Sequence, residues 1–208
     1  MGLNDVWRTV SSEVGFFYEV NFESVPAAPG VYAWFYPLRL VSQETNALNQ
    51  LVEEAQTLLS YNASSGTSEV ADLELPLSWW TWYVTAIRKA KMLQLADKHK
   101  KTWDATRADN AKFEAFRKAL LKSSILMPPL YVGKANNLQT RCAQHLGSSG
   151  FNHRFESFAK SNQFQVRTVR ELIFVCIRTD PVSDDDAATH ELLEELVKAI
   201  CAPPYGVQ

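Results

Sequence analysis

The segment "PPLYVGKANNLQTRCAQHLG", Pro128–Gly147, carries the clearest structural signals in this sequence. Two prolines precede a short apolar run that ends at Gly133, a pattern typical of a strand closed by a turn. Asn137 is a residue that helix N-caps prefer, and the spacing after it predicts a helix over 138–146 that Gly147 ends. The segment therefore predicts a strand, a turn and a helix in succession.

The predicted helix carries a cation and an imidazole on one face. Arg141 and His145 are four residues apart, so their Cβ atoms are expected about 5–6 Å apart. Both project toward the end of the strand, where Tyr131 and Lys134 lie beside the turn. A guanidinium can bind phosphate through two hydrogen bonds, and an imidazole exchanges protons near neutral pH. The four side chains predict a phosphate-handling cluster, with ordinary solvated helix residues as the alternative interpretation.

Hydrophobic periodicity predicts further elements on both sides of this segment. A β-branched and aromatic run within 28–38 and the run "ELIFVCIR" at 171–178 are typical of buried strands. Helical spacing of apolar residues is found in the segments 42–60, 79–103, 109–124, 151–160 and 187–202. In the third of these segments the expected apolar face consists of Phe113, Phe116 and Leu120.

These elements predict an α+β fold. A small mixed or antiparallel sheet is expected from the three predicted strands, with helices flanking it. Residues 37–127 contain only helical patterns, so they are expected to form a helical insertion between the two parts of the core, 1–36 and 128–208.

The charge of the chain is segregated along the sequence. The 208 residues are 46% apolar, which excludes disorder as the main state, and the net charge of -2 gives no overall basic field. Residues 79–124, however, hold eleven Lys or Arg against four Asp or Glu. Nucleic-acid contacts are therefore expected from a local set of cations: Lys98, Lys100, Lys101, Lys134, Arg141 and Arg154. Solvated helix faces, or a surface for a protein partner or a second copy of the chain, are the alternatives for the insertion.

The sequence has the features of a soluble cytoplasmic protein. Its three cysteines are odd in number and widely spaced, which is typical of reduced thiols. The first residues lack the apolar core of a signal peptide, and no apolar run approaches the roughly 20 residues that span a bilayer. No membrane partner is therefore expected.

Two short motifs resemble those of the GIY-YIG nuclease superfamily. "GVY" at 30–32 and "YVG" at 131–133 resemble the two tyrosine motifs that give the family its name. In the family an arginine follows the second tyrosine by ten residues, and a histidine often follows four residues later; Arg141 and His145 match both positions. The family also has a glutamate nine residues before the proline of its tail motif, and Glu194 stands at that distance from Pro203.

The resemblance implies a metal-dependent DNA endonuclease, with restriction or phage defence as the suggested role. Glu194 would hold one Mg²⁺ or Mn²⁺ ion, which takes oxygen ligands. Arg141 would neutralise charge that develops on the phosphoryl oxygens. Tyr32 or Tyr131, helped by His145 or Lys134, would position and deprotonate the attacking water. The implied catalytic residues are Tyr32, Tyr131, Arg141, His145 and Glu194.

The sequence departs from the family pattern in two places. The two tyrosines are separated by 98 residues, 33–130, whereas the family keeps its two motifs close together. Gly206 occupies the position of the family's tail asparagine, so a catalytically impaired nucleic-acid-binding or interaction module with the same fold is the second hypothesis. Glu191 and Glu195 are further candidates for the metal-binding carboxylate, because a helix register taken from sequence is uncertain by a residue or more.

A zinc site is a less favoured alternative. Cys142, His145 and His153 are residue types that bind zinc, but the chain has no second pair at ligand spacing.

Overall fold

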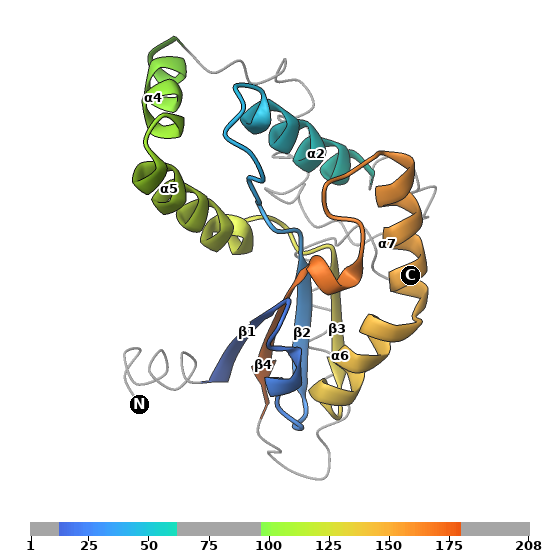
Figure 1. The fold of residues 1–208 in the computed structure, drawn as a ribbon. Helices are drawn as coiled ribbons and strands as arrows, with labels where there is room; N and C mark the ends of the chain where they lie inside the picture. The colour runs from blue at the N-terminus through green and yellow to red at the C-terminus, as the bar shows by residue number, and fades with distance from the viewer. Residues whose placement is uncertain (1–12, 62–96, 180–208) are drawn as a thin grey trace, which may run out of the picture. The chain divides into compact units, whose positions relative to one another are not determined.

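The computed structural model describes residues 13–61 and 97–179, which are the coloured parts of Figure 1. The chain divides into two compact units: Met1–Pro37 with Met127–Gln208, and Leu38–Leu126. The predicted helix at 187–202, with Glu194, and most of the predicted helix at 79–103 lie outside the described residues.

The first unit contains a four-stranded antiparallel sheet (Figure 1). Its strands, in spatial order, are β1 (Val14–Tyr18), β4 (Ile173–Arg178), β2 (Gly30–Phe35) and β3 (Tyr131–Ala135). Every neighbouring pair is antiparallel. The α+β class and the three predicted strands are confirmed, but the prediction of only three strands was wrong. The segment "VGFFY" of β1 consists mostly of residues that strands favour, but it is short, is interrupted by Gly15 and does not alternate apolar and polar residues, so it was missed.

The register of the sheet places the two tyrosine motifs side by side. Tyr32 of β2 is opposite Gly133 of β3, and Trp34 is opposite Tyr131. Residues that face each other across antiparallel strands point to the same side of the sheet. Both tyrosines therefore lie on one face, together with Phe174 of β4, which pairs with Trp34.

Two helices follow β3 in the first unit, α6 (Leu138–Gly147) and α7 (Gly150–Ser161). The side chain of Asn137 accepts a hydrogen bond from the backbone N–H of Thr140 at 2.9 Å, which confirms the predicted N-cap of α6. Gly147 is the last residue of α6, as predicted, but no described glycine has a positive φ, so the helix ends without a left-handed cap. The side chain of Ser149 caps α7 by accepting from the backbone N–H of Asn152 at 3.1 Å.

Aromatic side chains dominate the core of the first unit. Trp34, Tyr32, Phe155, Phe164 and Phe174 are at most 2% exposed. The rings of Trp34 and Phe174 meet edge to face with centroids 4.9 Å apart, a favoured geometry for aromatic pairs. The first unit also has short 3₁₀ turns, η1 (Phe22–Ser24) and η3 (Val169–Glu171).

The described part of the second unit is helical. It consists of α2 (Ala47–Tyr61), α4 (Asp97–Arg107), α5 (Asn110–Lys122) and the 3₁₀ turn η2 (Ser123–Leu126). Its core contains Leu40, Ala47, Leu51, Trp103 and Phe113. The helix expected from residue 42 begins at Ala47. Of the expected apolar face of α5, Phe113 is buried, whereas Phe116 is 37% exposed and its ring lies 5.9 Å from that of Trp103.

Within residues 13–61 and 97–179, the helices are too short or too polar to cross a bilayer.

Candidate functional site

Tyr32, Arg141 and His145 form one hydrogen-bonded cluster, although β2 and α6 are far apart in sequence. The hydroxyl of Tyr32 lies 2.8 Å from Nε2 of His145, across a sequence separation of 113 residues. Nε of Arg141 donates to the same hydroxyl at 3.0 Å. Tyr32 and His145 are each only 1% exposed, so these contacts form away from bulk water. As expected, the guanidinium of Arg141 and the imidazole of His145 lie on one face of α6. Both contact the hydroxyl of Tyr32 on β2.

Gly133 makes room for the Tyr32 hydroxyl. A Cβ atom at this position would lie 2.5 Å from the hydroxyl oxygen of Tyr32 and 3.0 Å from Cε1 of Tyr131. Real Cβ atoms do not approach other heavy atoms that closely, and the hydroxyl is held in place by Arg141 and His145. The glycine of the second motif is therefore required by close packing between neighbouring strands.

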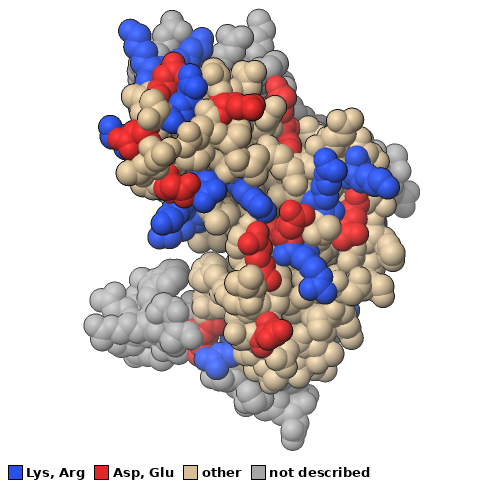
Figure 2. All heavy atoms as spheres, in the orientation of Figure 1, with Lys and Arg blue, Asp and Glu red and all other residues tan. Residues whose placement is uncertain are grey.

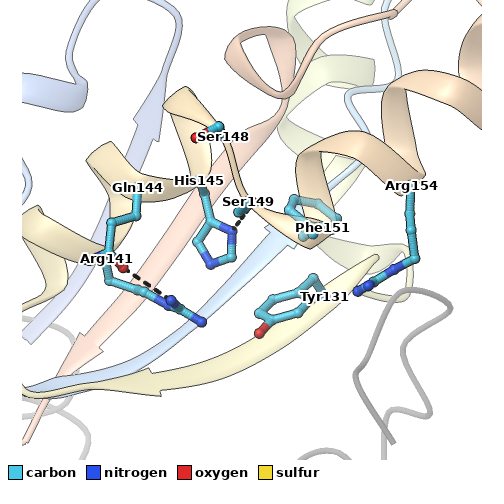
Figure 3. Close-up of a pocket in the computed structure, with 9 residues that line it drawn as sticks. Tyr131, Arg141, Gln144, His145, Ser148, Ser149, Phe151 and Arg154 are labelled. Atoms are coloured by element: carbon cyan, nitrogen blue, oxygen red, sulfur yellow. Dashed lines mark hydrogen bonds between the residues drawn. The ribbon is translucent and has the colours of Figure 1, made fainter.

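A pocket of about 290 Å³ opens beside this cluster (Figure 3). Tyr131 from β3, Arg141 and His145 from α6, and Phe151 and Arg154 from α7 point toward one another around it. Its wall is completed by Gln144, Ser148, Ser149 and Gly150. Tyr32 does not line the pocket. The two tyrosines thus occupy different layers, Tyr131 at the wall and Tyr32 behind it.

Aromatic contacts hold the two layers together. The rings of Tyr32 and Tyr131 are stacked with centroids 6.0 Å apart. The imidazole of His145 meets the Tyr131 ring at 5.1 Å and the Phe151 ring at 5.5 Å, both edge to face. The wall of the pocket is therefore made of rings that fix one another's positions.

Burial sets the protonation of the inner layer. Burial and the neighbouring Tyr131 raise the pKa of Tyr32 well above its usual range, although the hydrogen bond from Arg141 opposes this. Burial and the charge of Arg141 lower the pKa of His145 to about 4. Burial acts to lower the pKa of Arg141, but the hydrogen bond with Tyr32 and the electrostatic influence of Tyr32 and Tyr131 together outweigh this, and the pKa is raised. At neutral pH the cluster therefore holds a protonated phenol, a neutral imidazole and a permanent guanidinium cation.

The remaining predicted nucleic-acid residues lie in different places. Arg154 is exposed on α7 and lines the pocket with Arg141. Lys134 pairs with Val31 on β2, so it lies on the opposite face of the sheet from the two tyrosines. The expected grouping of Lys134 with Tyr131, Arg141 and His145 was therefore wrong, because successive strand residues alternate between faces. Lys98, Lys100 and Lys101 belong to α4 in the second unit, where the side chains of the latter two are exposed.

Sequence reasoning missed Gln144, Ser149 and Phe151 as parts of the site. Oε1 of Gln144 accepts from Nη1 of Arg141 at 3.1 Å. Ser149 Oγ lies 3.1 Å from Nδ1 of His145. A serine followed by a helical pattern indicates an N-cap, and this signal was available in the sequence. Its contact with His145 depends on the angle between α6 and α7, which the local sequence does not encode.

The described residues do not form a metal centre. Within 13–61 and 97–179 no three His, Cys, Asp or Glu side chains are placed as metal ligands. Cys142, His145 and His153 are all described, so they do not form the zinc site considered from sequence. The described lining of the pocket contains no carboxylate, and Glu194, with the alternatives Glu191 and Glu195, lies outside the described residues.

Comparisons of the chain with protein-family models, with curated proteins and with solved structures find no significant match.

Proposed function

We propose that this chain is an endonuclease that hydrolyses DNA phosphodiester bonds, with restriction or phage defence as its role. The observation that supports the proposal is that Tyr131, Arg141 and His145 line one pocket and that Tyr32 bonds to Arg141 and His145 directly behind its wall. These are the described members of the residue set that the GIY-YIG resemblance singles out. Strand pairing and a helix bring them together across more than a hundred residues.

The charge of the pocket favours an anionic substrate. Arg141 and Arg154 both line it, so two guanidinium groups face the pocket. A guanidinium that stays charged and is held by a neighbouring side chain can stabilise negative charge on phosphoryl oxygens as it develops. Arg141 is held in this way by Tyr32 and Gln144, so we assign Arg141 the role of binding the scissile phosphate.

The two phenols have different roles in this proposal. Tyr131 lines the pocket, so we assign its hydroxyl the role of orienting the attacking water. Tyr32 is buried behind the wall and accepts a hydrogen bond from Arg141, so it positions the guanidinium. Neutral His145 keeps Tyr32 in place through its Nε2 atom.

A divalent cation is part of the proposal, with Glu194 as the residue that would hold Mg²⁺ or Mn²⁺. The described residues of the pocket do not by themselves fit a metal, because Mg²⁺ prefers carboxylate and other oxygen ligands and no carboxylate is present among them. The chemical steps assigned above are therefore limited to the protein's own side chains.

Incubation of supercoiled plasmid with the purified protein and Mg²⁺ tests the proposal. Nicked or linear product is expected from the wild type. Arg141→Ala should reduce the cleavage rate about 10²- to 10³-fold, the usual effect of removing one transition-state charge donor. Glu194→Ala should also abolish Mg²⁺-dependent cleavage. Arg117→Ala is the matched control, because Arg117 is an exposed arginine of α5 that pairs with neighbouring Glu114.

Two outcomes would overturn the proposal. Equal cleavage by the wild type and both site variants would identify a contaminating nuclease. Salt-dependent DNA binding that Arg141→Ala weakens, without cleavage under any divalent metal, would instead support the nucleic-acid-binding module.

A further inference from the structure

A chain of four hydrogen bonds runs from the pocket through the buried cluster to the start of α7. Arg141 Nε donates to the Tyr32 hydroxyl at 3.0 Å, and this hydroxyl lies 2.8 Å from His145 Nε2. Nδ1 of His145 lies 3.1 Å from Ser149 Oγ. Ser149 Oγ in turn accepts from the backbone N–H of Asn152 at 3.1 Å.

The turn that carries Ser149 is fixed by a second set of bonds. The side-chain amide of Asn152 donates to the carbonyl oxygens of His145 and Gly147, at 3.2 and 3.1 Å. Asn152 is itself buried, at 7% exposure. The end of α6 and the start of α7 are therefore tied together, so Ser149 cannot move away from the imidazole without breaking these bonds.

The chemistry of Arg141 favours one direction for these four bonds. The guanidinium of Arg141 can only donate, so the Tyr32 oxygen accepts from it. Among the partners in these four bonds, the Tyr32 hydroxyl can donate only to Nε2 of His145. It can do so only when Nε2 carries no proton. The neutral imidazole then carries its proton on Nδ1 and donates to Ser149 Oγ. A serine oxygen has two lone pairs, so it can accept from both His145 and the N–H of Asn152.

We propose that Ser149 is a positioning residue that fixes His145 as the Nδ1–H tautomer, so that the bare Nε2 accepts from Tyr32 and the Tyr32 oxygen holds Arg141. Burial maintains this arrangement, because His145 and Tyr32 have almost no water to offer alternative partners. A hydrogen bond made by the second nitrogen of a histidine is a recognised determinant of its tautomer.

The functional consequence rests on the proposed endonuclease function. Without the Ser149 hydroxyl the imidazole could carry its proton on Nε2, and His145 and Arg141 would then both donate to the Tyr32 oxygen. The guanidinium would lose its defined orientation toward the pocket. The expected result is a lower kcat with little change in KM, since the charge that attracts the substrate is retained.

Nitrogen-15 NMR of the full chain labelled at histidine tests the tautomer without any need for activity. The signals of His145 are assigned by comparison with His145→Gln. In the wild type we expect a protonated Nδ1 and an unprotonated Nε2. Ser149→Thr keeps the hydroxyl and should give the same pattern, whereas Ser149→Ala should shift the population toward the Nε2–H form. Ser149→Asp can only accept at this position, so its spectrum provides the reference for a donating Nδ1.

A wild-type His145 protonated on Nε2 would overturn the inference. In that arrangement the Ser149 hydroxyl donates to Nδ1 of His145. The Tyr32 hydroxyl donates instead to the hydroxyl of Tyr131, its other hydrogen-bond neighbour. An unchanged tautomer in Ser149→Ala would overturn it as well. Both results can be obtained whether or not the protein cleaves DNA, so they are distinct from a failure of the proposed function.

Plasmid cleavage provides the second readout where the wild type is active. Ser149→Ala should lower kcat about 10- to 100-fold with KM nearly unchanged, and Ser149→Thr should restore it. Ser149→Ala also removes a helix cap and should lower the stability of the protein, whereas glycine is tolerated at an N-cap and should lower it much less. Ser149→Gly should therefore be nearly as stable as the wild type yet share the kinetic defect. Wild-type kcat in Ser149→Gly would assign Ser149 to capping alone.

Discussion

At the scale of single residues, His145 is the most constrained titratable group among the described residues. It is 1% exposed, both ring nitrogens have partners, and four aromatic rings surround it edge to face or tilted. Its lowered pKa of about 4 follows from burial and from the nearby charge of Arg141. An imidazole held neutral in this way contributes hydrogen bonds at neutral pH and becomes a source of instability in acid.

This residue gives a pH prediction with a defined sign. Between pH 6.5 and about 4 the unfolded chain binds a proton at this histidine while the folded chain does not, so stability falls as pH falls through this window. The expected loss is up to about 3 kcal/mol between pH 7 and 4. Urea unfolding of wild type and His145→Gln at both pH values measures it. The variant lacks this titration. The difference in free energy of unfolding between wild type and variant should therefore be smaller at pH 4 than at pH 7 by that amount. A difference that does not change with pH would contradict the burial argument.

At the scale of elements, the pairing of β2 with β3 builds the site more than any single side chain does. The register opposes Tyr32 to Gly133, and α6 begins only a few residues after β3. The helix therefore runs back beside β2 and β3, and its residues Arg141 and His145 lie next to the strand pair that carries the tyrosines. The strand, turn and helix thus bring three polar side chains, those of Tyr131, Arg141 and His145, next to Tyr32 on the paired strand.

Gly133→Ala tests this close packing. The new Cβ would meet the Tyr32 hydroxyl at 2.5 Å, so the strands must shift or the tyrosine must leave its partners. We expect a stability loss of about 1–3 kcal/mol, as for other overpacked cores, together with loss of cleavage. Gly147→Ala is the matched control, because a Cβ there meets nothing within 4 Å and alanine is favoured in helices by about 1 kcal/mol. Equal urea midpoints for the two variants would contradict the packing argument.

At the scale of the whole molecule, the chain divides its charge between two units. In the second unit, acids on α4 and α5 pair with basic residues three positions later, as in Asp104 with Arg107 at 2.8 Å and Glu114 with Arg117 at 2.9 Å. Figure 2 shows blue and red side chains intermingled over these helices on the face in view. Three of the eleven basic residues in 79–124, namely Arg107, Lys112 and Arg117, are thus engaged in local ion pairs.

The proposed DNA binding by α4 remains a prediction about the complete chain. Reversing Lys98, Lys100 and Lys101 to glutamate should weaken DNA binding and flatten the plot of log K against log salt, by about one unit of slope for each lysine that pairs with a phosphate. Fluorescence anisotropy with a labelled duplex at several salt concentrations measures both quantities. Lys112→Glu is the control, because Lys112 already pairs with Asp109 at 3.5 Å. Unchanged affinity and slope in the triple variant would leave α4 as a packing or partner-binding element.

The sequence by itself determined the local elements of this protein. The strand at Tyr131, the N-cap at Asn137 and the common helix face of Arg141 and His145 depend on residues within one or two turns of each other. Only the tertiary structure decided that β1 joins the sheet, that Lys134 faces away, and that Ser149 meets the imidazole. These features depend on which strands pair and how α6 meets α7, and such choices are made by burial and hydrogen bonding between segments that are distant in the chain.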